Sequence, residues 1–458
     1  MKINFYTLFL ICVLSTQAQN RQILFGFDEI PQNLMVNPSA KIHQKYHVSV
    51  PMLSGVYANI GISGFTIADL FADDGFDINT KLEGLIQQTS SKDYYTIHQQ
   101  VEVFNAGFTL NNNNKDYINF GFYEEFDFIL YHPKDLVTLF YEGNQDLTKT
   151  FNLNHFSLKG ELLGVFHVGI NRKINPKISI GLRAKLYSSV LNATSRVNHG
   201  TFSTFLDENN IYAHRLVNAD LEMKISGILN EDNQLVDMDR KSVINRFLAS
   251  GNMGAGLDFG IDYKVKDNIY IKASLIDLGF IRHVKNTKIY QLNGSYTFDG
   301  IGLLFPEGDF IDYWKDFEDE FDNQVPDKTS EGKYTTMRSL KFNTSIGYQF
   351  GESSKNNCIR PTIKTFSDEI GLQVFSVFRP KQPQFAATIY YHKYFSKHLQ
   401  TRVTYTIDDY NTGNIGAGFS SQIGKFNLYA TLDNIIGLTN LAKSKNQSFQ
   451  FGMNIILN

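Results

Sequence analysis

The chain has 458 residues, a formal net charge of −3 and 42% hydrophobic residues. Its length excludes a small disulfide-stapled fold, and its near-neutral charge gives no reason to expect a nucleic-acid partner. A mean hydropathy of −0.23 argues against a polytopic helical membrane protein. Aromatic residues make up 14% of the chain and there are 34 glycines, which together are typical of a large, half-apolar β protein.

The first 18 residues are predicted to be a secretory signal peptide. Lys2 supplies the positive start, residues 3–14 are mostly apolar, and Ala18 ends a small-residue cleavage site. The apolar stretch is too short to span a bilayer. Cleavage leaves Cys358 as the single cysteine of an exported chain, so no internal disulfide is expected.

After the signal peptide, apolar and polar residues alternate with a period of two. Between residues 251 and 265, Met253, Leu257, Phe259 and Ile261 share one face, and the polar residues share the other. Side chains of a strand alternate between its faces, whereas a helix would scatter these residues around its circumference. The alternating segments run for 9–15 residues and carry Tyr and Phe near their ends. These features favour a transmembrane barrel over a soluble sandwich, whose strands are shorter.

The predicted fold is therefore all-β: an antiparallel up-and-down barrel of about 14–16 strands, with long outer loops that carry short helices. Sixteen strands are expected at 46–64 (kinked near Pro51), 99–111, 115–127, 157–171, 176–190, 212–227, 251–265, 267–277, 286–298, 338–350, 370–378, 384–394, 398–408, 412–423, 424–433 and 447–457. Fourteen is the alternative.

A periplasmic C-terminus then fixes which connections lie on which side of the membrane. Short periplasmic turns are predicted at 111–115, 172–175 and 424–425, and long outer loops at 65–98, 128–156, 191–211, 299–337 and 434–446. The same scheme places 228–250 and 351–369 in the periplasm, with a short helix at Arg240–Ala249 that caps the barrel floor. A second loop helix is expected at Asn79–Gln88.

The loop at 307–327 combines nine acidic residues with a helical aromatic spacing. Phe310, Trp314, Phe317 and Phe321 recur at i, i+4, i+7 and i+11, and Asp316 and Asp319 belong to the acidic face. An amphipathic helix is predicted here. It would serve as a lid, a cation site or a partner-docking helix, or it is simply a solvated acidic face packed on the barrel rim.

Charged residues on the second face of the strands are candidates for the barrel lumen. They include Arg183, Lys185, Asp258, Asp262, Lys341 and Arg402. A polar interior is either a channel lining or a closed network of ion pairs, since buried charges need partners. No catalytic motif, metal motif or cofactor motif is present, so no catalytic, metal or cofactor-binding residue is assigned and a non-enzymatic protein is expected.

Two segments near the start resemble a known group. An Asn33–Ala40 stretch containing Asn37 and Pro38, followed by Phe65-Thr-Ile-Ala-Asp-Leu-Phe71, resembles Bacteroidota outer-membrane barrels of unassigned function. These in turn are similar to FadL-type and PorV-like proteins and to the PorP/SprF group. The resemblance implies a barrel at 46–458 and an N-terminal hatch at 19–45 tucked into it, with Asn37 and Pro38 near the periplasmic mouth.

Three functions remain open from the sequence. The first is a FadL-like conduit in the outer membrane for small ligands, including hydrophobic ones. The second is a non-enzymatic accessory or docking barrel that serves a type IX secretion or gliding apparatus, in which case the partner is a protein of that apparatus. The third is an outer-membrane enzyme, which has the least support. In each case outer-membrane lipid surrounds the wall.

Overall fold

A computed structural model describes residues 22–110, 115–208, 212–230, 234–236, 239–298, 328–351, 366–396, 398–408, 410 and 413–457. The predicted signal peptide and the predicted acidic helix with Phe310, Trp314, Asp316, Phe317, Asp319 and Phe321 lie outside these residues. Among the described residues, no helix is both long enough and apolar enough to cross a membrane.

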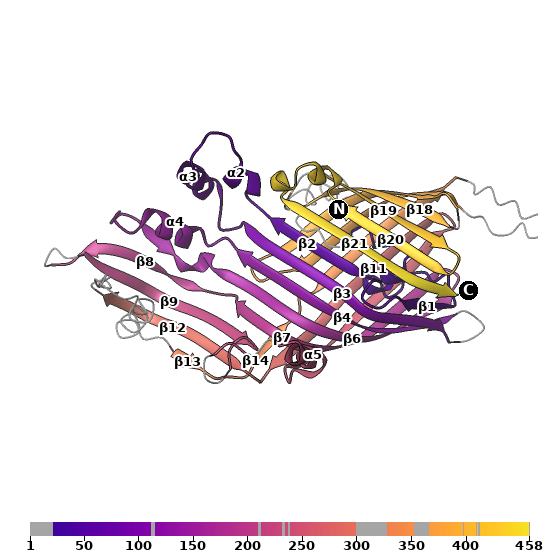
Figure 1. Cartoon of the computed structure of the whole chain (residues 1–458), viewed down its shortest axis with the longest axis horizontal. Helices are drawn as coiled ribbons and strands as arrows, with labels where there is room; N and C mark the ends of the chain where they lie inside the picture. Colours follow the sequence, from indigo (N-terminus) through magenta and orange to yellow (C-terminus); the bar gives the residue numbers. More distant parts are fainter. Residues whose placement is uncertain are drawn as a thin grey trace, which may run out of the picture.

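The strands form a closed antiparallel barrel (Figure 1). The strand pairings give its wall fourteen positions. Two positions consist of two pieces each: β1 with β2, which are separated at Pro51, and β14 with β15. Strand β21 pairs with both β1 and β2, and this pairing closes the circle. The wall strands in order are β1 (Tyr46–Ser49), β2 (Val56–Ile62), β3 (Tyr94–Thr109), β4 (Asp116–Tyr131), β6 (Ser157–Asn175), β7 (Ile178–Ser195), β10 (Met253–Lys266), β11 (Ile269–His283), β14 (Tyr334–Met337), β15 (Lys341–Phe350), β16 (Asp368–Phe378), β17 (Pro383–Tyr394), β18 (Leu399–Ile407), β19 (Asn414–Ile423), β20 (Phe426–Asp433) and β21 (Asn446–Leu457).

The structure corrects two of the sixteen predicted wall strands. Residues 212–227 and 286–298 do form strands, β9 (Tyr212–Ser226) and β12 (Thr287–Phe298), but these pair mainly with each other. Together with β5 (Thr150–Asn152), β8 (His199–Leu206) and β13 (Lys328–Ser330), they extend the sheet beyond one end of the barrel (Figure 1). Alternation predicted the strands correctly, but alternation alone does not show which strands are neighbours.

The two ends of the barrel differ. At the end where Tyr46 pairs with Leu457, here called the turn end, lie the connections between β3 and β4, β6 and β7, and β19 and β20, as predicted. The opposite end, here called the loop end, carries the extension sheet and the helices α2 (Ile67–Phe71), α3 (Ile78–Gln88) and α4 (Lys134–Glu142) (Figure 1). The short 3-10 helices η2 (Leu153–His155), η3 (Ile435–Thr439) and η4 (Leu441–Lys443) also belong to loop-end connections.

Helix α3 confirms the helix predicted at Asn79–Gln88. Asp77 caps it, because its carboxylate accepts hydrogen bonds from the backbone N–H groups of Asn79 and Thr80. The apolar side chains of Leu85 and Ile86 are buried. The helix packs against α2 and α4 at the loop end.

Helix α5 (Arg240–Ala249) forms where a helix was expected, but at the opposite end from the one predicted. It connects β7 to β10, so it lies at the loop end and not among the short turns at the other end. Counting residues 212–227 as a wall strand had reversed the direction of the chain here. The helix packs on the outside of the wall, where a Cβ atom on Gly164 would stand 2.1 Å from the carbonyl oxygen of Phe247.

The two faces of the wall differ in chemistry. In β10, Phe259 is 41% exposed on the outside, whereas its neighbour Asp258 is 0% exposed on the inside. The same alternation of exposed apolar and buried polar residues recurs in β16, β18 and β21. A closed wall satisfies its own backbone hydrogen bonds, and an apolar outer face is compatible with lipid. This is the architecture of outer-membrane barrels.

Candidate functional site

The lumen is filled by the N-terminal segment, residues 22–45. Residues 22–40 are buried, apart from Glu29 and Val36, which are partly buried. The segment contains one short 3-10 helix, η1 (Pro31–Met35), and otherwise runs through turns. A buried chain without long regular structure leaves many backbone groups in need of partners. The wall supplies them.

Charged and amide side chains of the wall hydrogen-bond to the backbone of this segment. Arg183 donates to the carbonyl oxygens of Leu34 and Met35, at 2.8 and 2.7 Å. Arg402 donates to the carbonyl oxygen of Phe25 at 2.7 Å. On the same principle, the Asn171 amide donates to two carbonyl oxygens, those of Pro38 and Ala40, both at 2.9 Å. These bonds fix the path of the segment across the lumen.

Side-chain pairs add to this attachment. The ammonium of Lys272 lies 2.7 Å from the carboxylate of Asp28. Asp262 accepts hydrogen bonds from the Asn37 amide at 2.8 Å and the Ser39 hydroxyl at 2.7 Å. Gln32 bridges two further wall residues: its amide donates to Glu102 at 2.9 Å and Asn454 at 2.8 Å. The segment is thus tied to widely separated strands.

Two glycines on facing strands make room for the segment. Gly181 of β7 and Gly260 of β10 are paired in register. A Cβ atom on Gly181 would stand 2.1 Å from the carbonyl carbon of Pro38, and one on Gly260 would stand 2.6 Å from Asn37. The Asn37–Pro38 motif therefore sits directly on the wall, near the turn end of both strands.

An apolar cluster holds the other part of the segment. Ile23, Leu24, Phe27 and Ile30 pack together with Tyr429 of β20. Gly416 and Gly418 of β19 leave room for Ile23, whose side-chain carbons would lie 2.8 and 2.7 Å from a Cβ atom at these positions. The Gly-x-Gly pattern in this strand is thus a packing feature.

Above the segment, an ion-pair network closes the lumen. Arg338 contacts Glu125 at 2.7 Å and also pairs with Glu161. Lys341 and Lys185 both pair with Asp277, at 3.0 and 2.6 Å. All of these side chains are buried or nearly so, and the remaining space among them is about 30 Å³. Opposite charges balance within the network, as buried charges require.

The structure brings four of the six predicted lumen residues together. Arg183 and Lys185 both contact Asp258, at 2.5 and 3.0 Å, and Lys341 joins them through Asp277. The other two, Asp262 and Arg402, contact the N-terminal segment instead.

Sequence reasoning missed Asp277 and Arg338. The register between β10 and β11 shifts at Asp258, and Asp277 adopts a positive φ of 65°. This irregularity turns the Asp277 carboxylate inward and takes it out of the simple alternation on which the prediction depended. Arg338 follows the end of β14, in the break before β15. Neither the bulge at Asp277 nor the break at Arg338 leaves a clear signal in a single sequence.

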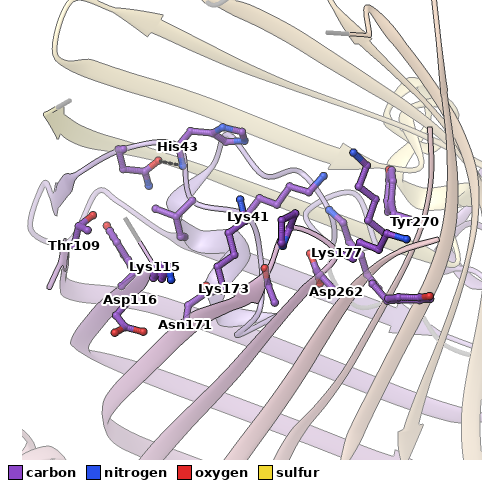
Figure 2. Close-up of a pocket in the computed structure, with 18 of the residues that line it drawn as sticks. Lys41, His43, Thr109, Lys115, Asp116, Asn171, Lys173, Lys177, Asp262 and Tyr270 are labelled. Atoms are coloured by element: carbon purple, nitrogen blue, oxygen red, sulfur yellow. Dashed lines mark hydrogen bonds between the residues drawn. The ribbon is translucent and has the colours of Figure 1, made fainter. Parts of the chain in front are cut away.

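Below the segment, the described residues form two pockets at the turn end. One has a volume of about 430 Å³ and is lined by charged residues, among them Lys41, Lys115, Lys173, Lys177 and Asp262 (Figure 2). The other has a volume of about 410 Å³ and is lined mainly by neutral polar residues such as Gln400, Gln422 and Asn427. Residues His43 and Gln44 border both pockets. The first pocket is here called the basic pocket and the second the neutral pocket.

One acidic residue of the N-terminal segment, Glu29, lines the neutral pocket. Burial, together with the neighbouring Asp28, raises the pKa of the Glu29 carboxyl to about 8. With its amide oriented to donate, Gln400 lies 2.7 and 3.1 Å from the two Glu29 oxygens. Glu29 is therefore a protonatable contact between segment and wall. Among the described residues, no group of three or more His, Cys, Asp or Glu side chains could hold a metal ion.

Several solved structures show a low overall similarity to this chain. They include the toluene transporter TbuX of Ralstonia pickettii, with a TM-score of 0.39, 9% identity and coverage of 93% of this chain and 94% of that one. A FadL homologue of Pseudomonas aeruginosa gives a TM-score of 0.43, 9% identity and coverage of 96% and 97%. The toluene transporter TodX of Pseudomonas putida gives a TM-score of 0.38 and 9% identity, with coverage of 93% of this chain and 91% of that one. These values are too low to assign a transported compound to this chain.

No curated protein matches the sequence. The resemblance to Bacteroidota, PorV-like and PorP/SprF-like barrels stays a prediction. One family model matches residues 38–433, which is most of the chain and nearly the whole wall. The chain therefore belongs to the family of unknown function DUF5723.

Proposed function

We propose that the protein is a gated outer-membrane conduit for small molecules and that residues 22–45 are its gate. One observation carries the proposal: a single chain segment blocks the lumen at mid-height, and two pockets of about 400 Å³ end against it. Short turns face the periplasm and longer loops face outward in bacterial barrels. The turn end, with its two pockets, is therefore assigned to the periplasm.

The contacts of the segment suit a gate because most of them are polar. Hydrogen bonds from Asn171, Arg183 and Arg402 to backbone carbonyls are exchangeable with water at a modest net free-energy change per bond. Arg183 also bonds to Asp258, so it connects the segment to the ion-pair network above. When the segment leaves, water reaches these charges, and the network can open as a hydrated, polar passage.

The lining of this route favours polar cargo. Apolar inner residues do exist, such as Leu163, Val165 and Phe375, but Leu163 and Val165 pack with Met35 and Tyr123, and Phe375 packs with Val377. All three are buried in these packed clusters, and none lines either of the two turn-end pockets. A hydrophobic ligand therefore remains a prediction of the sequence resemblance, and a polar or charged small molecule is the proposed cargo.

A flux measurement on one gate variant tests the proposal. Asn171→Ala removes two hydrogen bonds from the segment without leaving a buried charge, and should weaken docking by about 2 kcal/mol. In liposome-swelling assays this variant should admit small sugars several times faster than the wild type. The matched control is Asn192→Ala, because Asn192 is also buried but donates to Gly160 of the wall. Equal rates for the two variants would contradict the gate.

A docking barrel is the second candidate, and one observation favours it. Three phenylalanines on the loop-end connections are strongly exposed: Phe71 at 72%, Phe76 at 68% and Phe140 at 90%. Exposed aromatic residues are common at protein interfaces. Cross-linking in intact outer membranes would detect a partner; its loss in Phe140→Ser, but not in the control Leu147→Ser, would support docking. That the partner belongs to a secretion or gliding apparatus stays a prediction.

A further inference from the structure

The basic pocket has an unusual concentration of positive charge. Seven lysines line it, against two aspartates, Asp116 and Asp262. Lys41, Lys115, Lys173 and Lys177 are among them (Figure 2). The neutral pocket at the same end contains no lysine and one carboxylate, Glu29. Since both pockets open at the turn end of the same barrel, the difference is not a general property of that end.

Strand alternation directs these lysines into the mouth of the barrel. Lys173 lies two residues beyond Asn171, whose side chain reaches the N-terminal segment, and Lys264 lies two residues beyond the inward Asp262. By the same period, Lys115 and Lys177 precede the inward positions Tyr117 and Ser179. Lysines that bind lipid headgroups would occupy the outward positions. These occupy the inward ones.

Most of the acidic groups near the pocket already have partners. Lys272 pairs with Asp28 at 2.7 Å, and Lys264 pairs with Asp267 at 2.9 Å. Asp116 pairs with Arg172 at 2.6 Å, and Asp262 accepts hydrogen bonds from Asn37 and Ser39.

Five of the lysines form no ion pair: within the described residues, no carboxylate lies at ion-pair distance from Lys41, Lys45, Lys115, Lys173 or Lys177. Lys41 is held in place by Tyr270, whose ring centroid lies 5.0 Å from its ammonium.

We propose that the basic pocket binds a small, multiply charged anion of the phosphate type. Clefts lined by one sign of charge focus the electric field and attract the opposite charge, and lysine is a common phosphate ligand. A single carboxylate would neutralise only one of five ammonium groups, so a multivalent anion matches the pocket better. A volume of about 430 Å³ is in the range of small-molecule sites. That this anion is the cargo rests on the proposed conduit; the binding itself does not.

Isothermal titration of the full-length mature chain in neutral detergent tests the site, with inorganic pyrophosphate, inorganic phosphate and acetate as ligands. Pyrophosphate should bind more tightly than phosphate, acetate should give no measurable heat, and the affinity should fall steeply as NaCl is raised. Lys173→Gln combined with Lys177→Gln should weaken pyrophosphate binding at least tenfold. The control Lys266→Gln with Lys425→Gln removes two exposed lysines that do not line the pocket, and should change the dissociation constant less than twofold.

Several results would overturn the proposal. They are the absence of pyrophosphate binding at low salt, equal binding of acetate, equal losses in the two double variants, or displacement of pyrophosphate by a much tighter acidic peptide. Folding of each variant is checked by its heat-dependent migration in gels. Binding with no solute flux in either the wild type or Asn171→Ala would keep the site and refute the cargo assignment. Flux in Asn171→Ala without pyrophosphate binding would refute the site alone.

Discussion

The closed middle of the barrel and its open turn end handle charge in opposite ways. In the middle, Arg338, Lys341 and Lys185 each face carboxylates at close range, and almost no space remains. In the basic pocket, five lysines face solvent with no carboxylate at ion-pair distance among the described residues. Charge in the middle therefore stabilises one closed arrangement, whereas charge at the mouth is available to a ligand.

The largest effect on this contrast is expected from removing one cation of the ion-pair network in the middle of the barrel. Arg338→Ala would leave Glu125 and Glu161 buried without their main cation, which should destabilise the barrel by about 3–5 kcal/mol. Urea unfolding in lipid vesicles, followed by fluorescence, measures this loss. Arg282→Ala is the matched control on β11, because Arg282 is exposed, and should cost less than about 1 kcal/mol. A neutral Arg338→Ala would mean that the network is solvated.

A smaller effect is expected where the segment rests on the wall. Gly181→Ala places a methyl group against the backbone of Pro38, an overlap that should cost about 1–3 kcal/mol in docking. Hydrogen exchange of residues 22–45 should accelerate, while exchange in the wall strands stays unchanged. Gly84→Ala in α3 has no atom within 4 Å of the new methyl group and serves as the control. Faster exchange throughout the wall would show that Gly181 supports the barrel rather than the segment.

The smallest predicted effect is a dependence on pH. Glu29, whose side chain is 16% exposed, faces Asp28, Lys272, Glu369, His392 and Gln400. The pKa of Glu29 is raised to about 8 in the folded protein. Its protonated carboxyl therefore stabilises the docked segment at low pH, and this stabilisation is lost as the pH rises through 8. Docking of the segment should weaken by about 1.4 kcal/mol between pH 7 and pH 9. Hydrogen exchange of the segment at the two pH values measures the change, after correction for the intrinsic rate.

Glu29→Gln provides the control for this pH dependence. The amide has the same shape and cannot ionise, so exchange in the variant should be the same at pH 7 and pH 9 after correction. A pH dependence that persists in the variant would assign the titration to another group.

Much of the wall could be predicted from the sequence because alternation is a local property. It gave the strands, the break at Pro51 and the inward positions of Arg183, Lys185, Asp258 and Lys341. It could not show that β9 and β12 leave the wall, because strands of an extension sheet alternate in the same way. Nor could it find the pairing of Asp277, which depends on a bulge, or the partners of residues 22–45, which lie far away in the sequence.

Single-channel recording in planar bilayers tests most directly whether residues 22–45 close the lumen. The wild type should stay closed at low voltage, with only brief openings. Gly181→Ala, which loosens the segment without altering any charge, should spend a much larger fraction of time open at the same unit conductance. A steady open current in the wild type, or a Gly181→Ala channel as silent as the wild type, would contradict the account.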